Sequence, residues 1–180
     1  MFAIYFPDLF EEYAETLHSL HEDNPLLRPL FDGGIWPALS VNFPPNAYSR
    51  VHTDAGNKSN GMCPIFSLGD FDSTKGGHLW LPDLKLIIEF PPGCLIFIPS
   101  ASLRHGNIPV SKDEVRISWT QYAAGGLFRW VDYGCCSWAT LRSTDRERAD
   151  MEEARRSDRW QQAVKKFPTV ESLKSRVQPL

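Results

Sequence analysis

The chain has 180 residues, a formal net charge of −3, and 42% hydrophobic and 23% charged residues. This composition is typical of a soluble globular protein that buries its own core. The weak negative charge excludes polyanion binding by bulk charge alone, although a local basic face stays open. None of the four cysteines forms a C-x-x-C pair, which argues against a zinc ribbon.

The N-terminal part is predicted to be a helix and not a targeting segment. MFAIYFPDLFEEY has no basic stretch followed by a long apolar run, and no stretch has the length of a membrane span. We therefore expect an intracellular protein with reduced thiols and no membrane partner. The helix is predicted over residues 8–22, with Asp8 as its N-cap and Asp23-Asn24-Pro25 as its end signal. Its apolar stripe consists of Leu9, Phe10, Tyr13, Leu17 and Leu20.

Short apolar runs rich in β-branched and aromatic residues follow from about residue 35, separated by Gly and Pro turn signals. This pattern predicts an all-β sandwich or barrel. Two of the runs, LIIEF and CLIFIPS, are nearly continuous, which predicts strands buried on both faces or covered by the N-terminal helix. The predicted strands lie in IWPALSVNF, CPIFSLG, HLWLP, LKLIIEF, CLIFIPS and VRISWTQY.

The C-terminal part changes character again. Phe128 and Trp130 are expected to alternate on a strand and to belong to the core, with a stacking platform as the alternative. The charged residues 141–166 predict a solvated helix, and a last short helix is expected from about Thr169. Two interpretations stand for Cys135-Cys136: a redox pair, or two small half-buried residues after a turn. We predict one domain over residues 1–140, with its core at about 35–135, and a helical extension over 141–180.

The motif His52-Thr53-Asp54 is the first candidate for metal binding. On a strand, residues two apart point to the same face, so both side chains are placed to bind one ion. The sequence His21-Glu22-Asp23 has the same pattern but lies on the predicted helix, where such residues do not share a face. The third ligand is expected to be His105, which follows the CLIFIPS strand, with His78 as the alternative.

Two imidazoles and one carboxylate leave three coordination positions open, as in non-haem Fe(II) sites, whereas a structural zinc site is closed by four protein ligands. Cys63 lies close enough in the sequence to contact these ligands. Arg116 and Ser118 share one face of a predicted strand and offer a guanidinium fork and a hydroxyl to a carboxylate. A dicarboxylate such as 2-oxoglutarate can chelate the iron at one end and meet Arg116 at the other.

The motif R-x-S alone is weak evidence, because Arg155-Arg156-Ser157 also has it. The order of motifs along the chain is more specific: H-x-D, then a distant His, then R-x-S shortly after it. The alternative for Arg116 is an ion pair with a strand neighbour, either Glu89 or Glu114.

With these motifs the chain resembles the double-stranded β-helix 2-oxoglutarate/Fe(II) dioxygenases, and within them the TET/JBP-like group that is expanded in mushroom-forming fungi, often beside transposons. The resemblance implies a mainly β fold of the jelly-roll or cupin kind, with about eight strands over residues 35–122, a bracing N-terminal helix and a C-terminal helical extension. It implies His52, Asp54 and His105 as iron ligands and catalytic residues, Arg116 and Ser118 as the 2-oxoglutarate anchor, and O2 as co-substrate. The resembling segments are NFPPNAYSRVHTDAGN, SLGDFDSTKGGHLWLPDLKLIIEFPPGCLIFIPSASLRHGNIPV and EVRISWTQYAAGGLFRWVD.

The resemblance also implies a substrate site. Asn57 stands where TET-type enzymes have an Asn that hydrogen-bonds cytosine, and Tyr122 where they have a Tyr that stacks on the base. Ala124 stands where they have a further base-contacting His, and the chain lacks the Cys-rich segment of animal TET proteins. The alternatives are a turn role for Asn57 and a core role for Tyr122. Basic residues near these segments that offer phosphate contacts are Lys58, Arg50, Arg104 and Lys112.

Three functions are therefore compared. The first is oxidation of a methyl group, above all of 5-methylcytosine in DNA, which makes DNA carrying modified cytosine the partner and the nucleus the location. The second is hydroxylation of a small molecule or a protein side chain in the cytoplasm, which the net charge of −3 favours. The third is a transposon-derived binding module that has lost catalysis. No obligate protein partner is expected.

Overall fold

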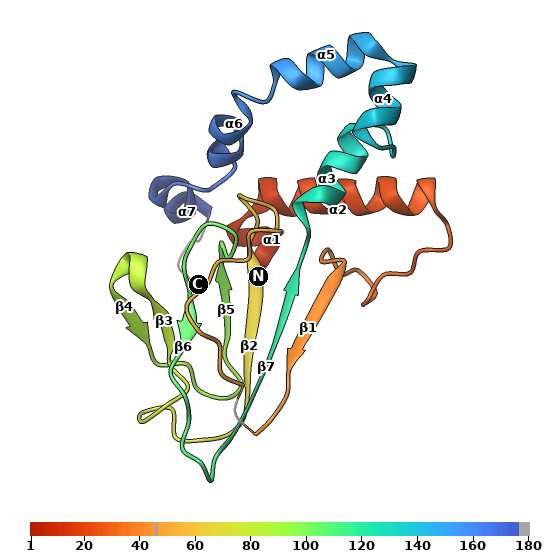
Figure 1. Cartoon of the computed structure of the whole chain (residues 1–180). Helices are drawn as coiled ribbons and strands as arrows, with labels where there is room; N and C mark the ends of the chain where they lie inside the picture. The colour runs from red at the N-terminus through yellow and green to blue at the C-terminus, as the bar shows by residue number, and fades with distance from the viewer. Residues whose placement is uncertain (46, 177–180) are drawn as a thin grey trace. The chain divides into compact units, whose positions relative to one another are not determined.

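The structure is a computed structural model that describes residues 1–45 and 47–176. All the strands that it describes lie in a compact unit formed by Trp36–Gly125. They form two antiparallel sheets, with strand orders β1-β7-β2-β5 and β4-β3-β6 (Figure 1). A 3-10 turn, η1 (Pro82–Leu84), joins β3 to β4. The strands are β1 (Ala38–Asn42), β2 (Cys63–Asp70), β3 (Leu79–Leu81), β4 (Leu86–Ile88), β5 (Leu95–Ile98), β6 (Gly106–Asn107) and β7 (Val115–Tyr122).

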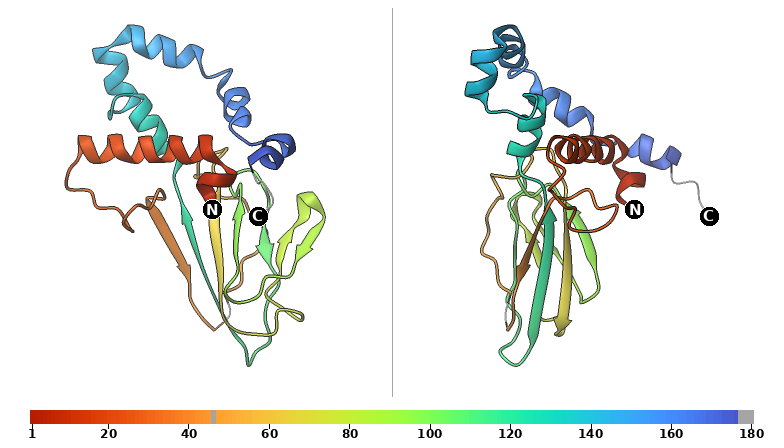
Figure 2. Two further views of the ribbon diagram at one scale, coloured as in Figure 1. Left: turned by 180° about the vertical axis from the view of Figure 1, so that it is seen from behind. Right: turned by 90° about the vertical axis from the view of Figure 1, so that its right-hand side faces the viewer.

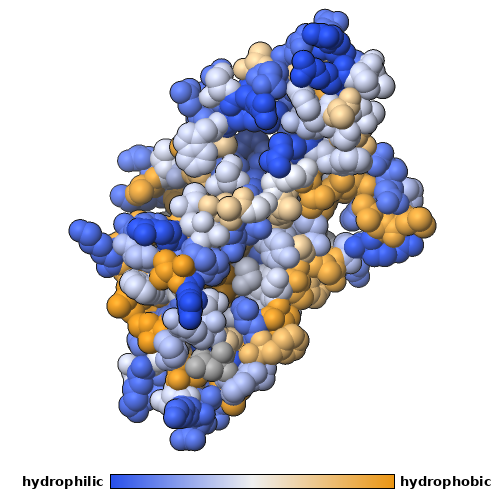
Figure 3. All heavy atoms as spheres, viewed as in Figure 1, coloured by the Kyte–Doolittle hydropathy of each residue, from blue (hydrophilic) through white to orange (hydrophobic). Residues whose placement is uncertain are grey.

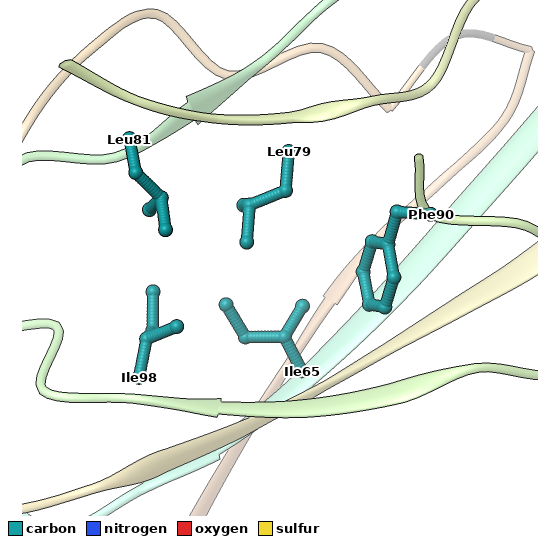
Figure 4. Close-up of a cluster of buried hydrophobic side chains, with 5 residues drawn as sticks. All are labelled: Ile65, Leu79, Leu81, Phe90 and Ile98. Atoms are coloured by element: carbon teal, nitrogen blue, oxygen red, sulfur yellow. The ribbon is translucent and has the colours of Figure 1, made fainter. Parts of the chain in front are cut away.

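A hydrophobic cluster joins the two sheets. Figure 4 shows Leu79 and Leu81 of β3 pointing toward Ile65 of β2 and Ile98 of β5, with Phe90 beside them. All five side chains are buried, and each contributes about 1.5–3 kcal/mol of hydrophobic stabilisation relative to an exposed position. This arrangement of two facing antiparallel sheets without a closed barrel confirms the predicted fold class for this unit.

The larger sheet carries the pocket described below. Its four strands run side by side in Figure 2. β7 is central and pairs with β1 on one side and with β2 on the other. In these ladders Asn42 is opposite Ser118, and Gly69 is opposite Arg116. Because side chains alternate along a strand, Arg116 and Ser118 face the same side of the sheet, as predicted.

The prediction that LIIEF and CLIFIPS are buried on both faces is wrong. In β4, Ile87 is 61% exposed, whereas Ile88 packs against the hydrophobic cluster. In β5, Leu95 is 36% exposed while Ile96 packs inward. Each strand therefore has one face that is at least partly exposed. Figure 3 shows hydrophobic side chains gathered on the surface over the β3–β4 hairpin, and others over the segment that follows α2 (Pro7–Asp23).

The second compact unit consists of residues 1–35 and the chain after Gly125. Helix α2 begins one residue earlier than predicted, with Pro7 as its first residue and Phe6 at the cap position. Asp8 is thus not the N-cap, because Pro with its fixed φ suits the first helical position, and Asp8 instead adds a favourable negative charge to the first turn. Within the predicted stripe Leu9, Tyr13 and Leu20 are buried.

The helices after β7 differ from the predictions in two ways. Phe128 and Trp130 lie on helix α3 (Gly125–Asp132) and not on the expected strand. Phe128 is buried against Tyr13 with a ring distance of 5.1 Å, as expected of a core residue, whereas the core prediction for Trp130 is wrong, because this residue is 40% exposed. The predicted helix over residues 141–166 is divided, because Asp145 accepts a hydrogen bond from the backbone of Arg148 and starts a new helix. The expected last helix is present. These helices are α3 (Gly125–Asp132), α4 (Trp138–Thr144), α5 (Arg146–Ala154), α6 (Arg159–Lys165) and α7 (Val170–Arg176), and α1 (Phe2–Tyr5) precedes α2.

The helices described by the structure include none with the length and apolar character of a membrane span. The division of the chain into a domain over residues 1–140 and an extension over 141–180 stays a prediction, and the compact units follow other boundaries. The bracing of the sheet by the N-terminal helix also stays a prediction.

Candidate metal centre and anion pocket

Three predicted ligands come together in the strand-containing unit. The potential ligand atoms of His52, Asp54 and His105 all lie within 4.8 Å of one another. The Asp54 carboxylate lies between the imidazoles, with Oδ1 3.4 Å from Nε2 of His52 and Oδ2 3.9 Å from Nε2 of His105. His78 is outside this group, so the geometry favours His105 over the alternative.

The backbone that holds the three residues is not the predicted strand. His52 and His105 form an isolated antiparallel bridge through two backbone hydrogen bonds of 3.0 and 2.9 Å. The backbone N–H of Asp54 donates to the carbonyl of Ser100 at 2.9 Å. The expected strand at His52-Asp54 is therefore wrong, because one bridge and one loop contact replace a ladder. The expected convergence of the side chains is nevertheless present.

Backbone carbonyls fix the tautomers of both imidazoles. Nδ1 of His52 lies 2.7 Å from the carbonyl oxygen of Arg50, and Nδ1 of His105 lies 2.9 Å from that of Leu103. A carbonyl oxygen only accepts, so each Nδ1 carries a proton, and Nε2 is the nitrogen of each ring that lies toward Asp54 and is placed to bind a metal. Imidazoles that bind metals have their second nitrogen oriented by such contacts.

The three candidate metal ligands differ in burial, and two of them are accessible from solvent. The whole His105 residue is 6% exposed, and this burial lowers the pKa of its imidazole, which favours the neutral form that binds metals. The side chains of His52 and Asp54 are 44% and 31% exposed. The donor set of two imidazoles and one carboxylate fits Fe(II), and the three donors found among the described residues leave room for further ligands.

A cavity of about 410 Å³ opens beside these three residues. Its wall along β7 consists of the alternate side chains Arg116, Ser118, Thr120 and Tyr122. A volume of this size lies within the usual range of small-molecule sites. The predicted metal ligands and the predicted carboxylate anchor thus line a single cavity.

Arg116 is a buried cation without a carboxylate partner among the residues that the structure describes. The residue is 3% exposed, Nη1 donates to the carbonyl of Ala47 at 2.7 Å, and Nε has no hydrogen-bond partner. Burial lowers the pKa of the guanidinium. A buried charge is normally paired, so the free donor marks a place for an anion.

The predicted alternative, an ion pair of Arg116 with Glu89 or Glu114, is not present. The Glu114 carboxylate accepts from two backbone N–H groups at 2.7 and 2.8 Å, and Glu89 accepts from the hydroxyl of Ser73 at 2.7 Å. Gly69 allows β2 to approach β7 at Arg116: its φ is +118°, and a Cβ there would lie 2.1 Å from the Val115 carbonyl oxygen. This glycine is not identifiable from the sequence, since its role depends on strand register.

The predicted substrate residues also line the cavity. The Asn57 amide donates to Oγ of Ser100 at 3.2 Å and to Oδ2 of Asp54 at 3.4 Å, and its backbone N–H closes a turn on the carbonyl of Asp54. The turn role of Asn57 is thus observed together with its place in the cavity. Tyr122 stands at the end of β7, and Ala124 forms an isolated bridge with Asn57. Contact of Asn57 or Tyr122 with a substrate stays a prediction.

Cys63 lies behind the candidate metal centre as a neutral thiol. Its sulfur accepts from the Ser100 hydroxyl at 3.0 Å, and burial raises the pKa of the thiol to about 11. A protonated thiol is a poor metal ligand. Ser100 was not identified from the sequence, because only the folded loop brings it beside Asp54 and Asn57. Among the basic residues expected to offer phosphate contacts, Arg104 is paired with Asp83, with Nε 2.7 Å from Oδ1.

Comparisons with known proteins find solved structures that resemble only part of this chain. No protein-family model and no curated protein matches the chain. A solved structure of NgTET1 in complex with 5mC DNA is 23% identical with a TM-score of 0.44, covering 52% of this chain and 36% of that one. A truncated viral collagen prolyl hydroxylase, vCPH from Paramecium Bursaria Chlorella virus-1, is 22% identical with a TM-score of 0.35, covering 47% of this chain and 52% of that one.

The 2OG complex of the same viral hydroxylase is 17% identical with a TM-score of 0.35, covering 61% of this chain and 68% of that one. The matched part thus spans 36% of the NgTET1 chain and 52% of the truncated hydroxylase. Any activity of this chain therefore has to be argued from its own site.

Proposed function

We propose that this protein is an Fe(II)- and 2-oxoglutarate-dependent oxygenase. The observation that carries the proposal is that Arg116, a buried cation with no carboxylate partner among the described residues, lies in the same cavity as His52, Asp54 and His105. The three nitrogen and oxygen donors of His52, Asp54 and His105, taken by themselves, indicate only a metal site. Together with an anion site in the same cavity, they account for a metal and a dicarboxylate bound side by side.

The roles of the residues follow from their contacts. The Nε2 atoms of His52 and His105 and the Asp54 carboxylate would hold Fe(II), with the backbone carbonyls of Arg50 and Leu103 fixing the rings. The Nε edge of Arg116 would bind the distal carboxylate of 2-oxoglutarate, because Nη1 is already taken by Ala47. Bound Fe(II) supplies the oxidation chemistry, in which O2 and 2-oxoglutarate are consumed and succinate and CO2 are released.

For the substrate we propose a methylated pyrimidine, above all 5-methylcytosine in DNA. Asn57 and Tyr122 line the cavity that holds the metal candidates, where one can hydrogen-bond a base and the other can stack on it. Chemistry on a base requires its extrusion from the duplex into such a pocket. A DNA substrate would place the protein in the nucleus, and membership of the fungal TET/JBP-like group is part of the same proposal.

A second candidate, hydroxylation of a small molecule or a protein side chain, is favoured by specific contacts. The Asn57 amide is already engaged by Asp54 and Ser100, Ala124 offers no base contact, and Arg104 is paired with Asp83. The third candidate, an inactive binding module, requires that a complete ligand group and anchor persist without use.

The test is succinate release with Fe(II) and 2-oxoglutarate across a panel of methylated DNA, methylated RNA and amino acids. We expect release by the wild type and loss in Asp54→Ala, with His78→Ala as the matched control that keeps activity. Undiminished release by Asp54→Ala would end the assignment of the metal centre.

Mass spectrometry of 5-methylcytosine duplexes then tests the substrate. We expect 5-hydroxymethylcytosine from the wild type and its loss in Asn57→Ala and Tyr122→Ala, with 2-oxoglutarate consumption retained in both variants. An iron-loaded wild type that consumes 2-oxoglutarate and leaves 5-methylcytosine unchanged refutes the DNA substrate and favours the second candidate.

A further inference from the structure

The hydroxyl of Ser118 has a defined direction in the cavity. Nδ2 of Asn42 lies 3.0 Å from Oγ of Ser118, in hydrogen-bonding contact across the β1–β7 ladder. A hydroxyl has one proton to donate and two lone pairs to accept with. Since the amide N–H occupies a lone pair, the hydroxyl proton must point away from Asn42.

That proton has no acceptor among the residues the structure describes, although Ser118 is only 4% exposed. Ser118 lines the cavity two positions along β7 from Arg116, on the same face. Two residues of a strand span about 6.6 Å, so a hydroxyl and a long guanidinium at these positions can address one carboxylate. The cavity that Ser118 and Arg116 both line offers this proton an open direction.

We infer that Asn42 is a positioning residue for the co-substrate: its amide directs the Ser118 hydroxyl proton to the carboxylate that Arg116 binds. The inference rests on the proposed function and extends the anchor to a residue on the edge strand β1. Asn42 acts through the donor direction of one hydrogen bond. Its effect therefore depends on whether residue 42 donates to Ser118 or accepts from it.

This dependence gives a test with two substitutions of opposite chemistry. In Asn42→Ala the hydroxyl is free to rotate, and 2-oxoglutarate is expected to bind about 3- to 10-fold more weakly, the effect of one neutral hydrogen bond. In Asn42→Asp the new carboxylate accepts the Ser118 proton, turns the hydroxyl around and adds a negative charge near the anion. The loss of affinity is therefore expected to exceed about 100-fold.

The measurement is calorimetric titration of 2-oxoglutarate into the full chain loaded with Mn(II), which binds without turnover. Val41→Asp is the matched control, because it adds the same charge to the same strand on the opposite face of the sheet, at a residue 38% exposed. It is expected to bind 2-oxoglutarate within about twofold of the wild type, since an exposed charge beyond the sheet is well screened.

A double-mutant cycle separates positioning from stability. If Asn42 acts through Ser118, then Asn42→Ala has no further effect on affinity in a Ser118→Ala background. An Asn42→Asp variant that binds as well as the wild type, or an Asn42→Ala effect that persists without the hydroxyl, overturns the inference. An Arg116→Gln arm tests the proposed function separately: undiminished binding there, or no binding by the wild type, refutes the co-substrate site and the inference with it.

Discussion

Replacing Arg116 by Met distinguishes an anion anchor from a structural residue. Met keeps the unbranched stem of the side chain, lacks the guanidinium group and carries no charge. If Arg116 serves the fold, its loss should destabilise the ligand-free protein. If it serves a ligand, the ligand-free protein should tolerate the change, and only the response to 2-oxoglutarate should disappear.

The magnitudes follow from the contacts of the guanidinium. Arg116→Met removes the hydrogen bond to the Ala47 carbonyl, which costs about 1.5–3 kcal/mol for a charged donor. It also removes a 3% exposed cation with no carboxylate partner among the described residues, whose burial costs several kcal/mol. The two effects oppose each other. We therefore expect the unfolding free energy of the ligand-free variant to stay within about 1 kcal/mol of the wild type or to rise.

The assay is urea denaturation with and without 2-oxoglutarate in the presence of Mn(II). At a ligand concentration of about 100 times Kd the wild type should gain about 2.7 kcal/mol, and Arg116→Met should gain nothing. A loss of about 3–5 kcal/mol in the ligand-free variant, as when one partner of a buried ion pair is removed, would refute the anion-anchor argument.

Glu152→Met is the matched control for that experiment. Glu152 is 6% exposed and accepts from Arg155 and Arg159 at 2.9 and 2.8 Å. Its removal should cost about 2–3 kcal/mol with no effect on ligand binding, a value reduced by the partial exposure of both arginines. A control that costs nothing would show that the assay does not sense buried charge.

His52→Ala should abolish binding of one equivalent of Mn(II) by calorimetry while circular dichroism stays unchanged, because His52 is a half-exposed side chain; retained stoichiometric binding would contradict its role. Leu79→Ala, in the buried cluster, should lower the unfolding free energy in urea by about 2–5 kcal/mol, whereas Ile87→Ala at a 61% exposed position should change it by less than about 0.5 kcal/mol. Equal effects would contradict the packing. Hydrogen bonds from Lys75 and Thr74 lower the pKa of Asp72 from 3.8 to about 2, so this pairing stabilises the fold above pH 4 and is lost as the pH falls toward 2. The stability difference between the wild type and Asp72→Asn should therefore shrink over that interval in pH-dependent denaturation, and a constant difference would refute it.

Most residues of the site could be predicted from the chemistry of their side chains and from the two-residue periodicity of strands. His52, Asp54, His105 and Arg116 were identifiable because their residue types, order and two-residue spacing are visible in the chain. The alternation that puts Arg116 on the same face as its neighbour Ser118 is a property of any strand and needs no tertiary information. Short apolar runs between Gly and Pro turn signals also located most of β1 to β5 and β7.

Features that depend on tertiary contacts were not predictable. β6 consists of Gly106–Asn107 alone, too short for a hydrophobic pattern. The backbone at His52 is held by one bridge to His105, so its local sequence does not specify a ladder. The role inferred for Asn42 could not be predicted from the sequence, because it depends on the register between β1 and β7. The helix that contains Phe128 and Trp130 was mistaken for a strand, since a short apolar run suits either structure until its packing partner is known.

The central claim is that one cavity binds a metal at His52, Asp54 and His105 and 2-oxoglutarate at Arg116. Anaerobic calorimetric titration of Fe(II), followed by 2-oxoglutarate, into the wild type tests it most directly. We predict one equivalent of each per chain, with 2-oxoglutarate binding much more weakly when the metal is omitted, because one end of the co-substrate chelates it. Binding of 2-oxoglutarate with the same affinity in the absence of metal, or no Fe(II) binding at all, would contradict the claim.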